Sequence, residues 1–292
     1  MESFIQQLIN GLSLGSVYAL IAVGYSLVYS ILLFSNFAHG GFLVTGGYIC
    51  YYALISTGNN IWISGLLALC GAGLTAIITE RLAYKPIRER TSVTLYLLIA
   101  SMGMSIVIEN FWVIMAGGRF RAIPPVLPTY PFKMGNLTIS SFDLLVFGIT
   151  ILLLFGLEFF LQKTKWGLAI RAAAYDLRVA ALMGVNVNKL ISIVFFLAGL
   201  LAAVSGIFLS VRYTLYPQLG FITIKAFVAA VVGGLGSLRG AVLGSLILGT
   251  AEMLTAGFIS SQLRDIVVFG LLVLTLLLRP TGLLGKAVSE KV

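Results

Sequence analysis

The chain contains 292 residues, of which 59% are hydrophobic and only 10% are charged, and it carries a formal net charge of +9. Soluble domains carry about a quarter of charged residues, so this chain has too little polar surface to cover a water-facing fold. The composition excludes a soluble enzyme, a nucleic-acid-binding module and a disordered protein. We therefore expect an all-α, polytopic transmembrane helical bundle, with residues 1–292 forming a single domain.

Apolar stretches of spanning length recur along the whole chain. A helix that crosses the membrane needs about 20 mainly apolar residues. Such stretches are predicted at residues 8–34, 41–56, 61–80, 93–116, 142–161, 190–211, 241–256 and 266–278, and a shorter apolar piece covers residues 223–232. This pattern predicts about eight or nine crossings, with nine if the short piece also crosses.

The connecting segments carry the charge that sets the orientation. They are a basic loop at residues 81–90, a proline-rich loop at 117–141 and a long basic loop at 163–189. With the first of these inside, alternation places thirteen of the 19 Lys and Arg residues on the cytoplasmic side, as the positive-inside rule expects. This predicts an external N-terminus and a cytoplasmic C-terminus, and it explains the net charge without a nucleic-acid partner.

A glycine-rich break follows the short apolar piece. Residues 223–232 are too few to span at about 1.5 Å per residue, and the sequence Gly233–Gly240 separates them from the next span. A backbone break at membrane depth survives only where protein or a water-filled cavity satisfies it, and such breaks mark transport pathways. The alternative is a simple turn between two tilted helices. Since the prolines fall in loops or at helix ends, we expect glycine to cause any irregularity within the spans.

Polar residues inside apolar stretches indicate a transport path or an internal ion pair. His39, beside Asn36, precedes the second span, and a hydrogen-bonded structural histidine is its alternative. Glu109 lies deep in the fourth span, whereas Lys225 can snorkel and Glu252 can be interfacial. The candidates for the substrate path are Asn36, Phe37, His39, Gly40, Glu109, Lys225, Gly234, Gly236 and Glu252.

The long basic loop has a helical pattern of its own. Ala173, Leu177, Ala180 and Gly184, a stripe of mostly small residues, are spaced to lie on one face of a helix, beside a polar face. Such a helix suits a groove on a soluble partner, and an amphipathic helix in the lipid interface is the alternative. The candidate contact residues are Arg171, Tyr175, Arg178, Ala180 and Gly184.

Several kinds of chemistry have no support in the sequence. It contains no G-x-x-x-x-G-K-[ST] motif, so ATP binding by a P-loop is excluded. One histidine and two scattered cysteines provide no metal site. We expect no cofactor and no enzymatic activity.

Six stretches, in order along the chain, carry a family resemblance. They are GLSLGSVYAL at 11–20, NFAHG at 36–40, AALMGV at 180–185, KAFVAA at 225–230, GGLGS at 233–237 and RPTGLLG at 279–285. The chain thereby resembles the LivH-type permease subunits of branched-chain amino acid ABC importers. The resemblance implies a bacterial cytoplasmic (inner) membrane protein, a second homologous permease in a heterodimer, two cytoplasmic ATPase subunits that hydrolyse ATP, and an extracytoplasmic substrate-binding protein. It also implies that residues 171–184 meet the ATPase.

The chain departs from the family pattern at two positions. Gly41 stands where the family commonly has Glu, and Glu109 stands where it commonly has an amide. These changes leave the substrate open between branched-chain amino acids, urea or short amides, and another small polar solute carried by the same family. A stand-alone secondary transporter or channel, with Glu109 and His39 as a proton relay, is the alternative from another class.

Overall fold

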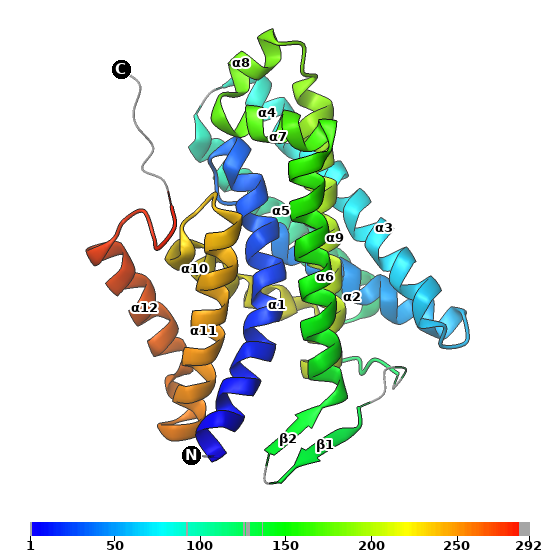
Figure 1. Ribbon diagram of the computed structural model, residues 1–292. Coiled ribbons are helices and arrows are strands. Elements are labelled where there is room, and N and C mark those ends of the chain that lie inside the picture. The colour runs from blue at the N-terminus through cyan, green and yellow to red at the C-terminus, as the bar shows by residue number, and fades with distance from the viewer. Residues whose placement is uncertain (1, 92, 125, 127–128, 136, 286–292) are drawn as a thin grey trace. The chain divides into compact units, whose positions relative to one another are not determined.

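A computed structural model describes residues 2–91, 93–124, 126, 129–135 and 137–285, and these residues are almost entirely helical (Figure 1). The α-helices are α1 (Glu2–Leu32), α2 (His39–Ser56), α3 (Ile61–Thr79), α4 (Lys85–Arg90), α5 (Thr94–Ala116), α6 (Ser141–Lys163), α7 (Lys165–Tyr175), α8 (Leu177–Leu182), α9 (Val187–Tyr213), α10 (Thr223–Gly233), α11 (Leu238–Phe258) and α12 (Arg264–Leu278). The other elements are the π-helix η1 (Glu80–Tyr84), the 3-10 helices η2 (Pro217–Ile222) and η3 (Ser261–Leu263), and the strands β1 (Pro131–Met134) and β2 (Leu137–Ser140).

The predicted fold class is confirmed. Among the described residues, seven helices are long and apolar enough to cross a membrane, and Pro217–Gly233 forms a shorter apolar segment. The 18-residue α2 coincides with the second predicted span and begins two residues earlier. The first helix begins at Glu2, earlier than the predicted residue 8, because nothing before Leu8 interrupts a helix.

The chain divides into two compact units that interleave along the sequence. One consists of Met1–Ser26, Leu127–Ile151 and Ile224–Val292, and the other of Leu27–Val126 and Leu152–Thr223. We call them unit 1 and unit 2. The helices α1 and α6 each contribute residues to both units. The single domain expected from the sequence stays a prediction.

Small residues let the helices of unit 2 approach closely. A Cβ at Gly46 of α2 would lie 2.5 Å from the Cα of Ala203 of α9, and one at Gly206 would overlap the carbonyl oxygen of Leu43. In lipid, where the hydrophobic effect does not drive helices together, such backbone approach provides the dispersion contacts that hold a bundle. Glycine is therefore required where α2 and α9 cross.

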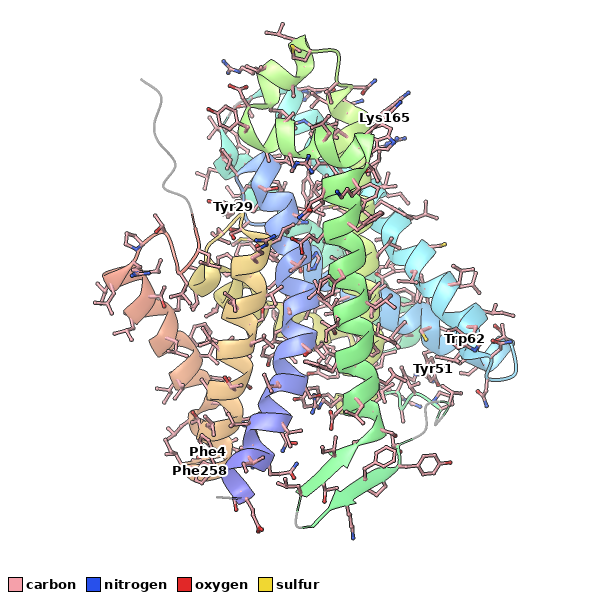
Figure 2. The ribbon with its side chains drawn as sticks, in the orientation of Figure 1. Phe4, Tyr29, Tyr51, Trp62, Lys165 and Phe258 are labelled. Carbon is pink, nitrogen blue, oxygen red and sulfur yellow. The ribbon has the colours of Figure 1, made fainter. Side chains whose placement is uncertain are left out.

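Unit 1 uses the same device between α1 and α11. A Cβ at Gly11 would lie 2.6 Å from the Cα of Thr250, and one at Gly15 would lie 2.8 Å from the carbonyl oxygen of Ser245. Figure 2 labels Phe4 and Phe258, whose ring centroids lie 6.3 Å apart where α1 begins and α11 ends. The packing thus continues to the end of both helices.

The prediction of a loop at residues 81–90 is wrong, because the helix of the third span continues from Ile61 to Arg90. Its path includes the π-turn η1, and Pro86 follows in the first turn of α4. Proline has no N–H and its ring excludes the carbonyl four residues earlier, so a widened turn before it relieves the conflict. The expectation that glycine alone causes irregularities is therefore also wrong here.

The predicted proline-rich loop contains a β-hairpin that the sequence analysis missed. Strands β1 and β2 pair antiparallel, with Phe132 opposite Ile139. Gln6 of α1 fixes the hairpin within unit 1, because its amide donates to the carbonyl of Thr138 (2.8 Å) and accepts from the Thr138 N–H (2.9 Å). The hairpin is thus attached to the start of the first span.

We predict that Gly206→Ala lowers the stability of the bundle. The added methyl group would overlap the Leu43 carbonyl, and overpacking of this kind costs about 1–3 kcal/mol. The measurement is the thermal unfolding midpoint of the purified protein in detergent. Gly103→Ala is the control, because a Cβ there meets nothing within 4 Å. Equal midpoints for the two variants would contradict the close crossing of α2 and α9.

Candidate functional site

The turn between α1 and α2 is buried and contains polar side chains. Asn36 is 1% exposed, and its Oδ1 accepts hydrogen bonds from the Tyr84 hydroxyl (2.7 Å) and from the Ala38 N–H (3.2 Å). Its buried Nδ2 has no hydrogen-bond partner in the described part of the chain. His39 is fully buried at the start of α2, with its ring edge-on to Phe42. The turn therefore presents a buried amide donor.

Neighbouring elements of unit 2 fix this turn. The Phe37 N–H donates to Ser101 Oγ on α5 (3.1 Å), and a Cβ at Gly40 would lie 2.6 Å from the carbonyl oxygen of Gly220 in η2. Of the predicted path residues, the structure thus brings together Asn36, Phe37, His39 and Gly40. Gly40 must stay without a side chain for η2 to pack here.

Glu109 is half-buried on α5, and its carboxylate has no hydrogen bond or ion pair among the described residues. It lies eight residues from Ser101, about 12 Å along the helix at 1.5 Å per residue, so it does not join the Asn36–Gly40 turn. A Cβ at Gly41 would lie 3.0 Å from the side chain of Ile108, which precedes Glu109. Gly41 therefore packs against the residue before Glu109, across the α2–α5 contact.

Lys225 and Glu252, predicted as separate candidates, form an ion pair in unit 1. Lys225 Nζ lies 2.8 Å from Glu252 Oε1 and 2.7 Å from Asp265 Oδ1. The Tyr18 hydroxyl donates to Glu252 Oε2 at 3.0 Å. We call these four residues the Lys225 cluster. It joins α10, α11 and α12 to α1, which identifies Lys225 and Glu252 as an internal pair, neither snorkelling nor merely interfacial.

Asp265 was missed by the sequence analysis. The signal was a single acidic residue immediately before the last apolar run, where a carboxylate also suits the N-terminus of a helix. Its partner, Lys225, lies forty residues earlier in the chain, and no local pattern relates the two positions.

The predicted break between the last helices is present. Helix α10 ends at Gly233, and α11 begins at Leu238 with the Ser237 side chain accepting a hydrogen bond from the Gly240 N–H (3.1 Å). Gly234 and Gly236 have φ angles of +113° and +81°. Residues with a side chain rarely adopt such backbone angles, so glycine is required at both predicted positions.

The basic segment after α6 folds differently from the prediction of one continuous helix. Asp176 adopts an extended conformation that ends α7, and its side chain caps α8 by accepting from the N–H groups of Arg178 and Val179. An aspartate is a strong helix N-cap, which breaks the predicted stripe. Gly184 lies beyond α8 with a φ angle of +88°.

The exposed face of this segment also differs from the prediction. Ala173 and Ala180 are buried, so the small residues face inward within unit 2 and do not form a free smooth surface. The Arg171 guanidinium donates to the Leu161 carbonyl, whereas Arg178 is exposed. Tyr175, a predicted contact residue, is strongly exposed, and so are three large side chains that the sequence analysis missed, Val179, Leu182 and Met183. These four residues and Arg178 are called the α7–α8 surface.

A second buried ion pair stabilises the end of the third span. Arg88 Nη1 lies 3.2 Å from Oε1 of Glu80, which is 1% exposed, and the Ser192 hydroxyl donates to the other oxygen of Glu80 (3.1 Å). Arg88 also donates to Asn188 Oδ1 (2.9 Å). The pair joins η1 and α4 to α9. From the sequence, Arg88 was interpreted only as one of the basic residues that set the orientation in the membrane.

Residues 7–276 match the pattern of the family described as "Branched-chain amino acid transport system / permease component". The chain belongs to this family. Because the match extends from α1 to α12, it covers the Asn36–Gly40 turn, the Lys225 cluster and the α7–α8 surface of this permease.

Full-length relatives agree with this assignment. The chain is 41% identical to the "High-affinity branched-chain amino acid transport system permease protein BraD" of Pseudomonas aeruginosa, covering 99% of this chain and 98% of that protein. It is 38% identical to the corresponding LivH protein of Escherichia coli K12, with the same coverage. A "Probable branched-chain amino acid transport permease protein LivH" of Methanocaldococcus jannaschii is 30% identical over 92% of this chain and 89% of its own length.

We predict that Tyr84→Phe loosens the Asn36–Gly40 turn. The change removes the donor that holds Asn36 Oδ1 and should lower the free energy of unfolding by about 0.5–1.5 kcal/mol. The measurement is the thermal unfolding midpoint. Tyr96→Phe, at a side chain that is 52% exposed, is the matched control and should leave it unchanged. A Tyr84→Phe protein as stable as the control would contradict the stabilising role of the hydrogen bond between Tyr84 and Asn36.

Proposed function

We propose that this chain is the permease subunit of an ATP-driven importer that carries branched-chain amino acids across the bacterial cytoplasmic membrane. The observation that supports this most strongly is the 41% identity to a high-affinity branched-chain amino acid permease over 99% of the chain. The similarity covers 98% of both this relative and the Escherichia coli protein, so it extends over the whole permease and is not confined to one segment.

The proposal includes partner proteins that supply what this chain lacks. Its sequence has no P-loop motif, so two cytoplasmic ATPase subunits would bind and hydrolyse ATP. An extracytoplasmic binding protein would deliver the substrate, and a second homologous permease would complete the path. Nucleotide binding would drive transport only through a different affinity for the outward-open and inward-open states.

The proposed path involves the Asn36–Gly40 turn, Glu109 and the break at Gly234 and Gly236. The buried Nδ2 of Asn36 is a donor suited to a substrate carboxylate, and the Glu109 carboxylate is an acceptor suited to an ammonium group. Because Glu109 lies about 12 Å along α5 from Ser101, which contacts the turn, the two residues would meet an amino acid at different points of the path. Urea and short amides have no ammonium group to match Glu109, which favours the amino acid as substrate.

The α7–α8 surface is the proposed contact with the ATPase. Its residues combine exposed apolar side chains with the Arg178 guanidinium on short helices. Such a helical projection fits a groove on a soluble partner. Ala180 would support the surface from inside, and Arg171, bonded to Leu161, would hold its base. Tyr175 and Arg178 would make the contact, with Gly184 ending the projection.

The alternative from another class is a transporter or channel that works alone on an ion gradient. The observation that favours it is the Glu109 carboxylate, which has no hydrogen bond or ion pair with the described residues. Reconstitution of this chain alone in liposomes separates the two functions. Substrate flux without the ATPase subunits would contradict the proposed importer.

We predict that Arg178→Glu abolishes ATP-dependent uptake when the complete complex is present. The change reverses the charge of an exposed side chain at the proposed ATPase contact and leaves the buried core untouched. Uptake of labelled leucine and substrate-stimulated ATP hydrolysis are measured, with complex assembly checked by co-purification. Lys133→Glu in the hairpin is the control, since it makes the same charge change at an exposed position of unit 1 that is not part of the α7–α8 surface. Normal uptake with Arg178→Glu would refute the coupling assignment.

We also predict that the two exposed segments label from opposite sides of the membrane. A cysteine at Lys133 should react with a membrane-impermeant maleimide added to intact spheroplasts, whereas one at Arg178 should react only after lysis. Cys50 and Cys70 are replaced by serine first, because both are free thiols. Labelling of both positions from outside would contradict the cytoplasmic placement of the α7–α8 surface.

A further inference from the structure

Helix α10 is too short to position itself in a bilayer. Its 11 residues extend about 16 Å at 1.5 Å per residue, against a hydrocarbon core of about 30 Å. Its ends must therefore meet protein groups that satisfy them, because lipid offers no hydrogen bonds. In the described part of the chain, η2 leads directly into the first end of α10, Asp265 of α12 binds the Lys225 side chain in its first turn, and residues 283–284 bond its last carbonyls.

The first end is held by charge. Lys225, in the first turn of α10, contacts two carboxylates, the 96–97% buried Glu252 and the exposed Asp265 at the start of α12. The second oxygen of Glu252 is occupied by the Tyr18 hydroxyl. Without Lys225, Glu252 would be a buried carboxylate with no cation beside it, which is strongly unfavourable. Because Glu252 is fixed in this way, Asp265 is the partner that links α10 to α12.

The second end is held by backbone hydrogen bonds. The N–H groups of Leu283 and Leu284 donate to the carbonyl oxygens of Val232 (2.9 Å) and Gly233 (2.8 Å). These are carbonyls of the last turn of α10, which have no intrahelical donors. The segment after α12 thus supplies the bonds that another helical turn would have made.

Glycines make this second contact possible. Gly282 has a φ angle of +76°, and a Cβ there would lie 2.5 Å from the Gly234 nitrogen. Gly234 itself has a φ angle of +113°, and a Cβ would overlap Gly285. By contrast, a Cβ at Gly270, within α12, meets nothing within 4 Å. The chain therefore offers a matched pair of glycines on the same C-terminal segment.

We infer that α12 and residues 279–285 form a two-point clamp on α10, with Asp265 and Gly282 as positioning residues for transport. The inference rests on the proposed function. The clamp makes α10 and α12 move as one body, so that the break at Gly234–Gly236 keeps its geometry while the permease changes state. Neither Asp265 nor residues 282–284 touch the substrate in this scheme.

Charge variants of the complete importer, reconstituted in proteoliposomes, test the first contact. Asp265→Asn should lower the maximal rate of leucine uptake at least tenfold while the KM changes less than twofold, because positioning fails and substrate recognition by the binding protein does not. Asp265→Glu should retain most of the rate. Uptake by Asp265→Asn equal to that of the wild type would overturn the clamp.

Glycine variants test the second contact independently of the charges. Gly282→Ala should lower the uptake rate at least tenfold with normal co-purification of the subunits, whereas Gly270→Ala should behave as the wild type. Equal loss in both variants, or loss in neither, overturns the inference. The wild-type complex separates this result from the proposed function: absence of amino-acid uptake there contradicts the importer, whereas wild-type uptake with insensitive variants contradicts only the clamp.

Discussion

The structure depends on one constraint, that every backbone polar group inside a bilayer needs a partner within the protein. Long helices satisfy it along most of their length, and seven helices in the described part of the chain are long and apolar enough to span. The break after Gly233 is the place where the constraint becomes demanding. There the carbonyls of Val232 and Gly233 accept hydrogen bonds from N–H groups fifty-one positions later, so these two carbonyls keep a partner where the helix ends.

The same constraint decides how the charged residues are used. Glu80 and Glu252 are both nearly fully buried, and each has a cation and a hydroxyl donor, Arg88 with Ser192 and Lys225 with Tyr18. Glu109 differs, because its carboxylate has neither among the described residues. This contrast is why the two paired acids serve as structural contacts in our account, whereas Glu109 is the acid assigned to the transport path.

Sequence reasoning reached those features that depend on local composition. Spanning length, the glycine break and the polar turn at Asn36 each follow from neighbouring residues. It failed where a single residue changes the path, as with the Asp176 cap and with Pro86 after a π-turn. It also failed where partners are distant, since nothing near Lys225 indicates Asp265, and nothing near Val232 indicates Leu283. These contacts arise only when the chain has folded.

The interleaving of the two units has a consequence for biogenesis. Gly11 and Gly15 pack against residues of α11, more than two hundred positions later, so the partner surface of α1 does not exist until synthesis is nearly finished. Contacts of such long sequence separation form late and slowly. During translation the glycine face of α1 must therefore stay exposed to lipid or bound to a chaperone until α11 is made. A chain truncated before α11 lacks the surface against which its first helix packs.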